Sequence, residues 1–362
     1  MLKFLMRRLG TMILTAFCLT FVVFFLTNLH PNLVKLAKTE ASARMSDDQV
    51  NSWLQSHGYA APLVSRYGEW LGLVPGWTGT NAETGKPTGR CVDPNAPDTP
   101  APRYCGILQG DWGTSTVFKQ PVSTIIGIRM GLTGLLMLWV LIVMIPTSLI
   151  IGILAGMREG SRTDRVLSTL SIASTATPEY VSGVVLIVLF GSTTVGLSPL
   201  FKSLGLLSSG TLFKGSASSA MDHITFDNFA LPVMTIALYG IGYIARMTRA
   251  SMTEVMTAQY IRTARLKGVS FRNVVLKHAL RNALIAPFTV IMLQIPWLLN
   301  GVVITETLFN YKGFGWTLVA AAEGNDIELL LGCSVVAVVV VLLTQLISDI
   351  GYVYLNPRIR IS

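Results

Sequence analysis

The sequence feature that most constrains the fold is a run of 21 residues without a charge, residues 9–29 (LGTMILTAFCLTFVVFFLTNL). A helix rises about 1.5 Å per residue, so this run is long enough to cross the hydrocarbon core of a bilayer. Only 13% of the residues are charged, about half the share in soluble domains. The chain is therefore predicted to be an all-α polytopic membrane protein with about six transmembrane helices, the other apolar runs being 131–157, 167–191, 230–252, 283–305 and 328–355.

The basic residues Lys3, Arg7 and Arg8 precede the first apolar run, a combination that also occurs in secretory signal peptides. The run is too long for a signal peptide, and no small-residue cleavage site follows it. We therefore expect residues 9–29 to remain as an uncleaved first span, with residues 1–8 in the cytoplasm.

Lysine and arginine gather on one side of the predicted spans. With six spans both termini lie on the same side, together with the loops at about 158–166 and 246–282. These segments, with residues 1–8 and the tail 356–362, hold 16 of the 28 Lys and Arg residues, and the positive-inside rule places such segments in the cytoplasm. Topology thus accounts for the net charge of +9, and nucleic-acid binding is not predicted.

A long predicted external loop, residues 30–130, follows the first span. Ser46, followed by two acids and by regularly spaced apolar residues, predicts a short helix outside the membrane. Residues 75–103 are rich in Pro, Gly, Thr and Asn, which indicates a loop or hairpin insertion rather than a separate domain. A second external loop covers residues 192–229.

Two of the four cysteines, Cys91 and Cys105, lie in the external loop, on the oxidising side of the membrane. A disulfide between them would stabilise the loop by about 3 kcal/mol on the chain-entropy account. Two free thiols and half a metal site are the alternatives. The sequence has no second CxxC and no His near these cysteines, so a metal site is not favoured. Cys18 and Cys333 fall within predicted spans, so we expect both to be small buried apolar residues.

Motifs of nucleotide binding and hydrolysis are absent from the sequence. It contains no G-x-x-x-x-G-K-[ST], no G-x-G-x-x-G, no H-E-x-x-H and no G-x-S-x-G. The four histidines are scattered: His30, His57, His223 and His278. We therefore expect no catalytic residue, no metal site and no ATP hydrolysis by this chain, so that energy must come from a partner or an ion gradient.

The densest polar stretch is the predicted cytoplasmic loop at 253–287. Its pattern predicts a helix to about Lys267, a break at Gly268, an N-cap at Ser270 and a second helix that continues into the fifth span. The corner is basic, with Arg262, Arg265, Lys267 and Arg272. Two helices around a glycine are more than a connecting loop needs, which favours a partner contact over contact with lipid headgroups.

Three polar residues within the predicted spans are candidates for the transport path. Glu179 follows Pro178 in the third span, where an ionised carboxylate in lipid is costly, so it should face the helix bundle. Gln294 and Asn300 lie six residues apart in the fifth span. Hydrogen bonds between helices are the alternative role for both residues.

Residues 260–268 (YIRTARLKG) and 278–284 (HALRNAL) resemble the coupling loop of ABC importer permeases in its dipeptide/oligopeptide form. The general family pattern has an acidic residue and a proline where this chain has Arg262 and Arg281, so the peptide-type pattern is the better match. Two places depart from it: residues 71–108 look like an insertion, and residues 130–133 replace the usual opening of the second span. Other matching positions are Arg7, Arg8, Leu9, 110–115, 158–160, Asp164, Arg165, Pro178, Glu306, Phe309, Gly313, Gly315, Asp326, Asp349 and 356–358.

This resemblance implies a permease subunit of an ATP-driven importer in the inner membrane, with residues 131–355 as its transmembrane core. A homologous permease would complete the path, two ATPase subunits would bind ATP and Mg, and a periplasmic or extracellular binding protein would deliver the substrate. The family's substrates include short peptides, nickel complexes and sugar conjugates, so the substrate stays open. The alternative is a secondary transporter or channel, for which inverted repeats or paired intramembrane charges are expected and not found. The residues that the resemblance assigns to the ATPase contact are Arg262, Thr263, Ala264, Arg265, Leu266, Lys267, Gly268 and Val269, with Leu266 and Val269 making the apolar contact.

Overall fold

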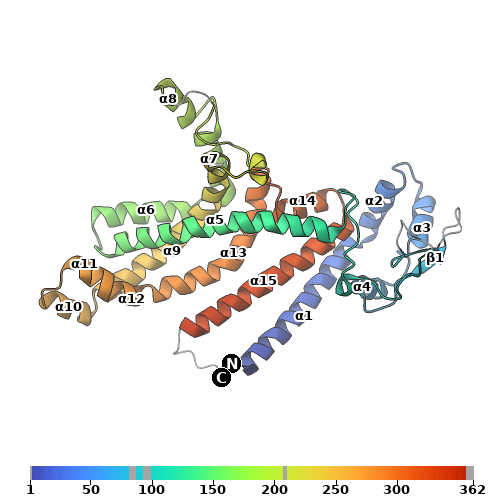
Figure 1. Ribbon diagram of the computed structural model, residues 1–362, viewed down its shortest axis with the longest axis horizontal. Coiled ribbons are helices and arrows are strands. Elements are labelled where there is room, and N and C mark those ends of the chain that lie inside the picture. Colours follow the sequence, from blue (N-terminus) through green and yellow to red (C-terminus); the bar gives the residue numbers. More distant parts are fainter. Residues whose placement is uncertain (1, 81–86, 93–98, 207–209, 356–362) are drawn as a thin grey trace. The chain divides into compact units, whose positions relative to one another are not determined.

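The computed structural model describes residues 2–80, 87–92, 99–206 and 210–355, and is mainly helical (Figure 1). The predicted cytoplasmic tail, 356–362, lies outside these residues. The chain forms two compact units. The first unit is Met1–Ile128 with Thr317–Val340, and the second is Arg129–Trp316 with Val341–Ser362.

The first unit begins with the long helix α1 and continues through the predicted external loop. Its short strands β1 and β2 pair antiparallel, with Thr78 opposite Gly89. The elements, some of which continue into the second unit, are α1 (Leu2–Thr27), α2 (His30–Glu40), α3 (Asp47–Ser56), α4 (Leu63–Leu71), β1 (Thr78–Thr80), β2 (Pro87–Gly89), η1 (Ile107–Gln109), α5 (Val122–Gly156), α14 (Phe314–Glu323) and α15 (Ile327–Leu355).

The short helix predicted after Ser46 is α3, and its start follows from a local hydrogen-bond exchange. The Ser46 hydroxyl accepts from the Gln49 backbone N–H at 3.4 Å, and the Ser46 N–H donates to the Gln49 side chain at 2.9 Å. This capping box gives hydrogen-bond acceptors to two backbone N–H groups that would otherwise lack a partner at the start of the helix. The two acids in the first turn, Asp47 and Asp48, suit the positive end of the helix dipole.

An aromatic cluster forms the core of the first unit. Tyr67 and Trp70 of α4 are 3% and 2% exposed, and their rings pack against Phe24 of α1 at 5.3 and 5.6 Å. The predicted external segment therefore returns to cover part of the first apolar helix. Further buried members are Leu33, Leu36, Ala37, Val50, Leu54, Ile327 and Leu331.

The predicted insertion at 71–108 contains the β1–β2 hairpin and the turn η1 rather than a separate domain. Cys91 and Cys105 are joined in a disulfide, with Cα atoms 5.5 Å apart. Cys333 is buried, whereas Cys18 is exposed. The expectation that Cys18 would be buried is therefore wrong, because it lies on a face of α1 that the chain itself leaves uncovered.

The second unit is a bundle built around α9. Its elements, besides the rest of α5, α14 and α15, are α6 (Arg162–Ala176), α7 (Glu179–Leu186), η2 (Ile187–Gly191), α8 (Leu197–Ser203), η3 (Ser218–Met221), α9 (Phe226–Met256), α10 (Gln259–Leu266), α11 (Phe271–Asn273), η4 (Val274–Ala279), α12 (Leu280–Ala283) and α13 (Ile285–Leu308). Helices α6, α7 and α13 all pack against α9.

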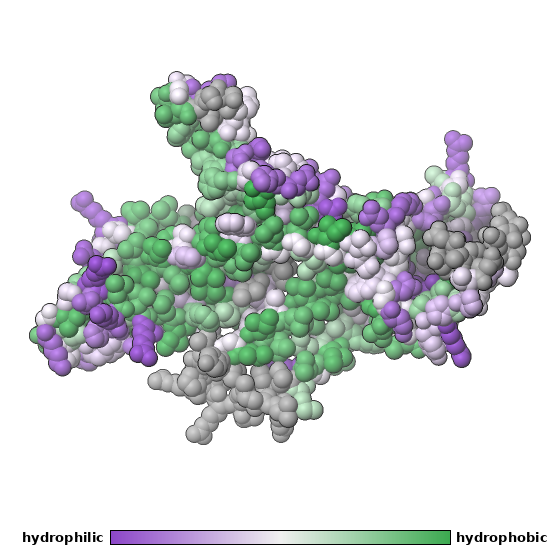
Figure 2. All heavy atoms as spheres, viewed as in Figure 1, coloured by the Kyte–Doolittle hydropathy of each residue, from purple (hydrophilic) through white to green (hydrophobic). Residues whose placement is uncertain are grey.

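Small residues allow the neighbours of α9 to come close. A Cβ atom added to Gly242 of α9 would lie 2.1 Å from the Ser174 hydroxyl oxygen of α6. One added to Gly152 of α5 would lie 2.3 Å from Thr248 of α9. Because bundles in lipid rely on close van der Waals packing, these contacts position the whole unit. Figure 2 shows hydrophobic side chains over the middle of this bundle and hydrophilic ones at α10 and α11.

Among the described residues, four helices are long and apolar enough to cross a membrane individually: α1, α5, α9 and α15. The count rises to six if each of two bent helix pairs is one span. The predicted third span, 167–191, is one of these pairs, since α6 and α7 meet at 108°. Pro178 explains the bend, because proline excludes the preceding residue from the helical conformation, and Thr177 has a ψ of 124°.

Candidate functional site

A helix pair projects from the end of α9, where the sequence predicts the partner contact. The first helix of the pair is α10, and the second runs from residue 271 to residue 283 through α11, η4 and α12. The predicted helix to Lys267 is interrupted at Thr257 and Ala258, between α9 and α10. Gly268 forms the corner with a φ of +76°, the left-handed region that favours glycine. Ser270 occupies the N-cap position, but its side chain makes no capping hydrogen bond.

The underside of the 259–283 helix pair is an apolar cluster that attaches it to the bundle. Ile261 is fully buried there against Met252 of α9 and Val274 of the second helix. Ala264 is 8% exposed, and Val269 packs partly buried against the same cluster. Ala264 and Val269 therefore help to hold the pair together, and the apolar contact of the partly exposed Val269 with a partner stays a prediction.

The tip of the pair presents the other predicted residues to solvent. Leu266 is 82% exposed, so the described part of the chain leaves this large apolar side chain uncovered. The remaining exposed members are Arg262, Thr263, Arg265, Lys267 and Gly268. An exposed leucine surrounded by basic residues is typical of a protein–protein interface. In such an interface the apolar centre contributes binding free energy, and the charges guide association.

Two interactions connect the helix pair and the end of α9 to neighbouring segments. Arg158 and Arg265 both lie over the ring of Phe271, with guanidinium carbons 5.2 and 5.9 Å from its centre. Nearby, Arg249 of α9 makes a two-pronged ion pair with Asp164 of α6, at 2.6 and 2.8 Å. Because Asp164 is only 3% exposed, this pair joins the start of α6 firmly to the end of α9.

A second candidate site lies within the bundle, where α7 meets α13. Glu179 is the first residue of α7, directly after the bend. A Cβ atom added to Gly301 of α13 would lie 2.4 Å from a carboxylate oxygen of Glu179, so glycine leaves room for this side chain. Among the described residues, the other Glu179 oxygen has no hydrogen-bond partner.

Unpartnered polar atoms continue along α13. Gln294 Nε2 and the Thr305 hydroxyl are buried and likewise lack a partner within the described part of the chain. Gln294, Gly301 and Thr305 are separated by seven and four residues, so they lie on one face of the helix. The side chain of the predicted Asn300 lies outside the described ones. A buried polar group is costly unless it is hydrogen-bonded, so this polar face is suited to solutes or water that pass along it.

Sequence reasoning identified Glu179 and Gln294 but missed three participants. Thr305 could have been found, because it lies eleven residues from Gln294 and therefore on the same helical face. Gly301 and the Asp164–Arg249 pair depend on contacts between distant segments, which no local pattern reveals. Among the described residues, no group of three or more His, Cys, Asp or Glu side chains could hold a metal ion.

Several membrane-crossing helices, a polar face within the bundle and a projecting helix pair define a membrane transport protein that works with partners. A model of the binding-protein-dependent transport system inner membrane component family matches residues 148–361. The chain belongs to this family. It is a multi-pass inner-membrane permease subunit of an ABC importer and not itself an enzyme, and it works with a binding protein and the ABC machinery.

Relatives align over most or all of the chain. The di/tripeptide transport system permease protein DppB of Pseudomonas aeruginosa is 30% identical over 99% of both chains. The oligopeptide transport system permease protein OppB of Mycobacterium tuberculosis is 28% identical over 100% of both. The oligopeptide transport system permease protein AppB of Bacillus subtilis is 34% identical over 70% of this chain and 77% of its own. Full coverage in the first two indicates that the long 30–130 segment is shared with some relatives.

Proposed function

We propose that this chain imports short peptides, forming the translocation path together with a second, homologous permease. The relatives support this substrate class, since they are named as di/tripeptide, dipeptide and oligopeptide permeases. Two ATPase subunits bind ATP and Mg below the membrane, and a binding protein delivers the peptide from outside. Both termini and residues 253–282 face the cytoplasm, as the distribution of basic residues indicates.

The exposed tip of the 259–283 helix pair is the observation that carries this proposal. Leu266 enters an apolar groove of an ATPase subunit, while Arg262, Arg265 and Lys267 supply complementary charge at the rim. Movement of the ATPase then displaces the pair. The helix pair is packed on α9, and the Asp164–Arg249 ion pair joins α9 to α6. Displacement of the helix pair therefore moves the bundle, which opens the path to each side of the membrane in turn.

The polar face of α13 lines the path in this proposal. Glu179, Gln294 and Thr305 offer the unpartnered polar atoms, and Asn300 stays a candidate from the sequence. A peptide bond carries one donor and one acceptor, and such a face can exchange hydrogen bonds with it as the solute passes.

The test is to place a charge at the tip. Leu266→Asp should lower peptide transport in proteoliposomes at least about tenfold and prevent copurification of the ATPase subunits, because the carboxylate would be buried in an apolar contact. Leu276→Asp is the matched control, since Leu276 lies on the same helix pair, is 53% exposed and is distant from the corner. It should retain both properties.

A second pair of variants separates corner geometry from general strain. Gly268 and Gly160 have φ values of +76° and +75°, and a Cβ atom would meet nothing within 4 Å at either. Valine should cost about 1–3 kcal/mol of local strain at both positions. Only Gly268→Val should uncouple transport from ATP hydrolysis.

Equal transport by Leu266→Asp and the unmodified protein would refute the coupling assignment.

A further inference from the structure

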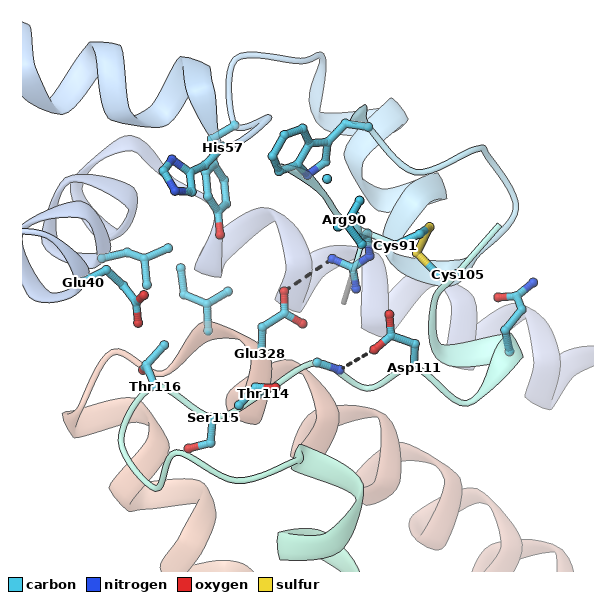
Figure 3. Close-up of a pocket in the computed structure, with 18 of the residues that line it drawn as sticks. Glu40, His57, Arg90, Cys91, Cys105, Asp111, Thr114, Ser115, Thr116 and Glu328 are labelled. Carbon is cyan, nitrogen blue, oxygen red and sulfur yellow. Dashed lines mark hydrogen bonds and ion pairs between the residues drawn. A yellow bond between two sulfur atoms is a disulfide. The ribbon is translucent and has the colours of Figure 1, made fainter. Parts of the chain in front are cut away.

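The first unit contains a cavity of about 930 Å³ that the permease mechanism does not use (Figure 3). Its size falls within the range of sites for small ligands. Residues from α2, α3, the end of the β hairpin, the 104–119 segment and the first turn of α15 line it, and all of them belong to the first unit. The cavity therefore lies on the segment predicted to be external.

Aromatic side chains form one side of this cavity. Trp53 stacks on His57 with ring centres 4.0 Å apart, and Tyr59 stacks on Trp53 at 6.0 Å. Trp77 lies directly over Gly58, where an added Cβ atom would be 2.7 Å from the indole ring. Gly58 also has a φ of +78°, so the residue is suited both to the turn and to the close approach of Trp77.

A partly buried ion pair forms the other side. Arg90 donates to Glu328 at 3.4 Å, and their side chains are only 17% and 26% exposed. In the part of the chain that the structure describes, neither Arg90 Nε nor Glu328 Oε2 has a hydrogen-bond partner. Cys91 is bonded to Cys105, so the disulfide next to Arg90 anchors this wall.

The charges of the cavity favour a positively charged ligand. Three carboxylates line it, from Glu40, Asp111 and Glu328, against the basic side chains of Arg90 and Lys119. Lys119 is 76% exposed and 3.9 Å from Glu40, so it lies at the edge. Figure 3 shows the carboxylates of Asp111 and Glu328 pointing toward the side of the cavity that holds Arg90.

The hydroxyl of Tyr59 keeps its proton throughout the physiological range. Burial, and after it the negative charge of Glu328, raise the pKa of Tyr59 to about 12. The wall therefore carries a protonated phenol beside an incompletely bonded carboxylate. Aromatic faces and carboxylates together attract ammonium groups, by cation–π attraction and by charge-assisted hydrogen bonds.

We infer that this cavity binds the ammonium end of a short peptide, with Glu328 accepting from the ammonium and the Trp53–Tyr59–Trp77 wall contacting the rest. The inference rests on the proposed peptide substrate. It gives Trp77 and residues 89–92 a role in a preliminary binding site on the outside, distinct from the polar face between α7 and α13.

The test uses the full-length chain with its partner permease in lipid nanodiscs, and trialanine as the probe. Trp53 and Trp77 line the cavity, so binding should change tryptophan fluorescence. N-acetyl-trialanine, which lacks the ammonium group, should bind at least about tenfold more weakly. Equal binding of the two peptides, or no binding of trialanine at about 10 mM, would overturn the inference.

Variants locate the binding. Glu328→Gln should weaken trialanine binding about tenfold, because the amide keeps the shape and removes the charge. Glu323→Gln is the control, an exposed glutamate five residues away that does not line the cavity. Thr116→Phe narrows the cavity without removing a charge and should also weaken binding, so a folding defect of Glu328→Gln cannot decide the outcome. Unchanged binding by both cavity variants would contradict the site.

Transport measured in parallel separates this inference from the proposed function. If Glu328→Gln and the unmodified protein import trialanine with the same concentration dependence and bind it equally, the outer site is wrong and the import function stands. If the unmodified complex binds trialanine but imports no peptide, the proposed function is wrong and the binding site stands.

Discussion

Two glutamates of the second unit, one on α13 and one packed against it, have opposite surroundings. Glu306, near the end of α13, is 0% exposed, and both of its oxygens accept hydrogen bonds. The Thr133 hydroxyl of α5 donates to one oxygen, and the Trp316 backbone N–H of α14 donates to the other at 2.9 Å. Gly313 lies so close that an added Cβ atom would overlap the carboxylate. Glu306 thus joins three helices.

Glu179 meets the same helix at Gly301 and has no comparable arrangement. The side chain is only partly buried, and both carboxylate oxygens lie within 2.7 Å of where a Cβ atom on Gly301 would be. One of these oxygens is buried without a partner among the described residues. Folding alone does not favour such a group, since an unsatisfied buried carboxylate lowers stability. The comparison teaches that a position next to α13 does not by itself identify a functional carboxylate. The state of its hydrogen bonds does, and we assign structure to Glu306 and transport to Glu179.

The largest effect is expected at Glu306. Glu306→Ala removes the acceptor of two hydrogen bonds and leaves the Thr133 hydroxyl and the Trp316 N–H without this partner. The free energy of unfolding should fall by about 2–5 kcal/mol, measured as thermal stability of the purified protein in detergent. Glu306→Gln, which keeps one acceptor oxygen and the side-chain shape, should lose less. If the alanine variant is as stable as the unmodified protein, the structural assignment is wrong.

A smaller effect, of a different kind, is expected at Glu179. Glu179→Gln removes the charge from a carboxylate with one oxygen that lacks a partner among the described residues, so stability should change by less than about 1 kcal/mol. Transport should nevertheless fall about tenfold, as expected when a hydrogen bond to a charged group is lost during passage. Uptake and thermal unfolding of the same preparation give both numbers. A variant that loses stability but transports normally would reverse the comparison.

The sequence predicted one member of this pair from local physics and the other only by family resemblance. The position of Glu179 after Pro178 in an apolar run was sufficient to select it. The surroundings of Glu306 could not be predicted from the sequence. Thr133 lies 173 residues away in the chain, and the periodicity of a sequence does not indicate contacts between such distant residues. The same limit applies to Val269: its helix corner was predicted, but its packing under the 259–283 pair depends on α9.

Apolar run length predicted the helical membrane fold, since the bilayer imposes a length on every crossing helix. Local capping chemistry predicted α3 from Ser46, because both partners lie within one turn. The 108° bend between α6 and α7 was missed, although Pro178 is visible in the sequence. Proline predicts a break, but the direction of the following helix is decided by packing against α9 and α13.

The smallest effect is expected at Gly301, and it tests the space next to Glu179 directly. In Gly301→Ala the new Cβ atom would lie 2.4 Å from the Glu179 carboxylate, which must move. The end of a glutamate side chain moves at little cost, and alanine favours the helix over glycine by about 1 kcal/mol, so stability should be nearly unchanged. The displaced carboxylate should raise the KM for peptide uptake about two- to threefold, corresponding to roughly 0.5 kcal/mol. Gly134→Ala is the control, because this α5 glycine has open space where the Cβ would be and should gain helix stability without a change in KM. If Gly301→Ala and Gly134→Ala show the same KM, the position of the Glu179 carboxylate does not matter for transport.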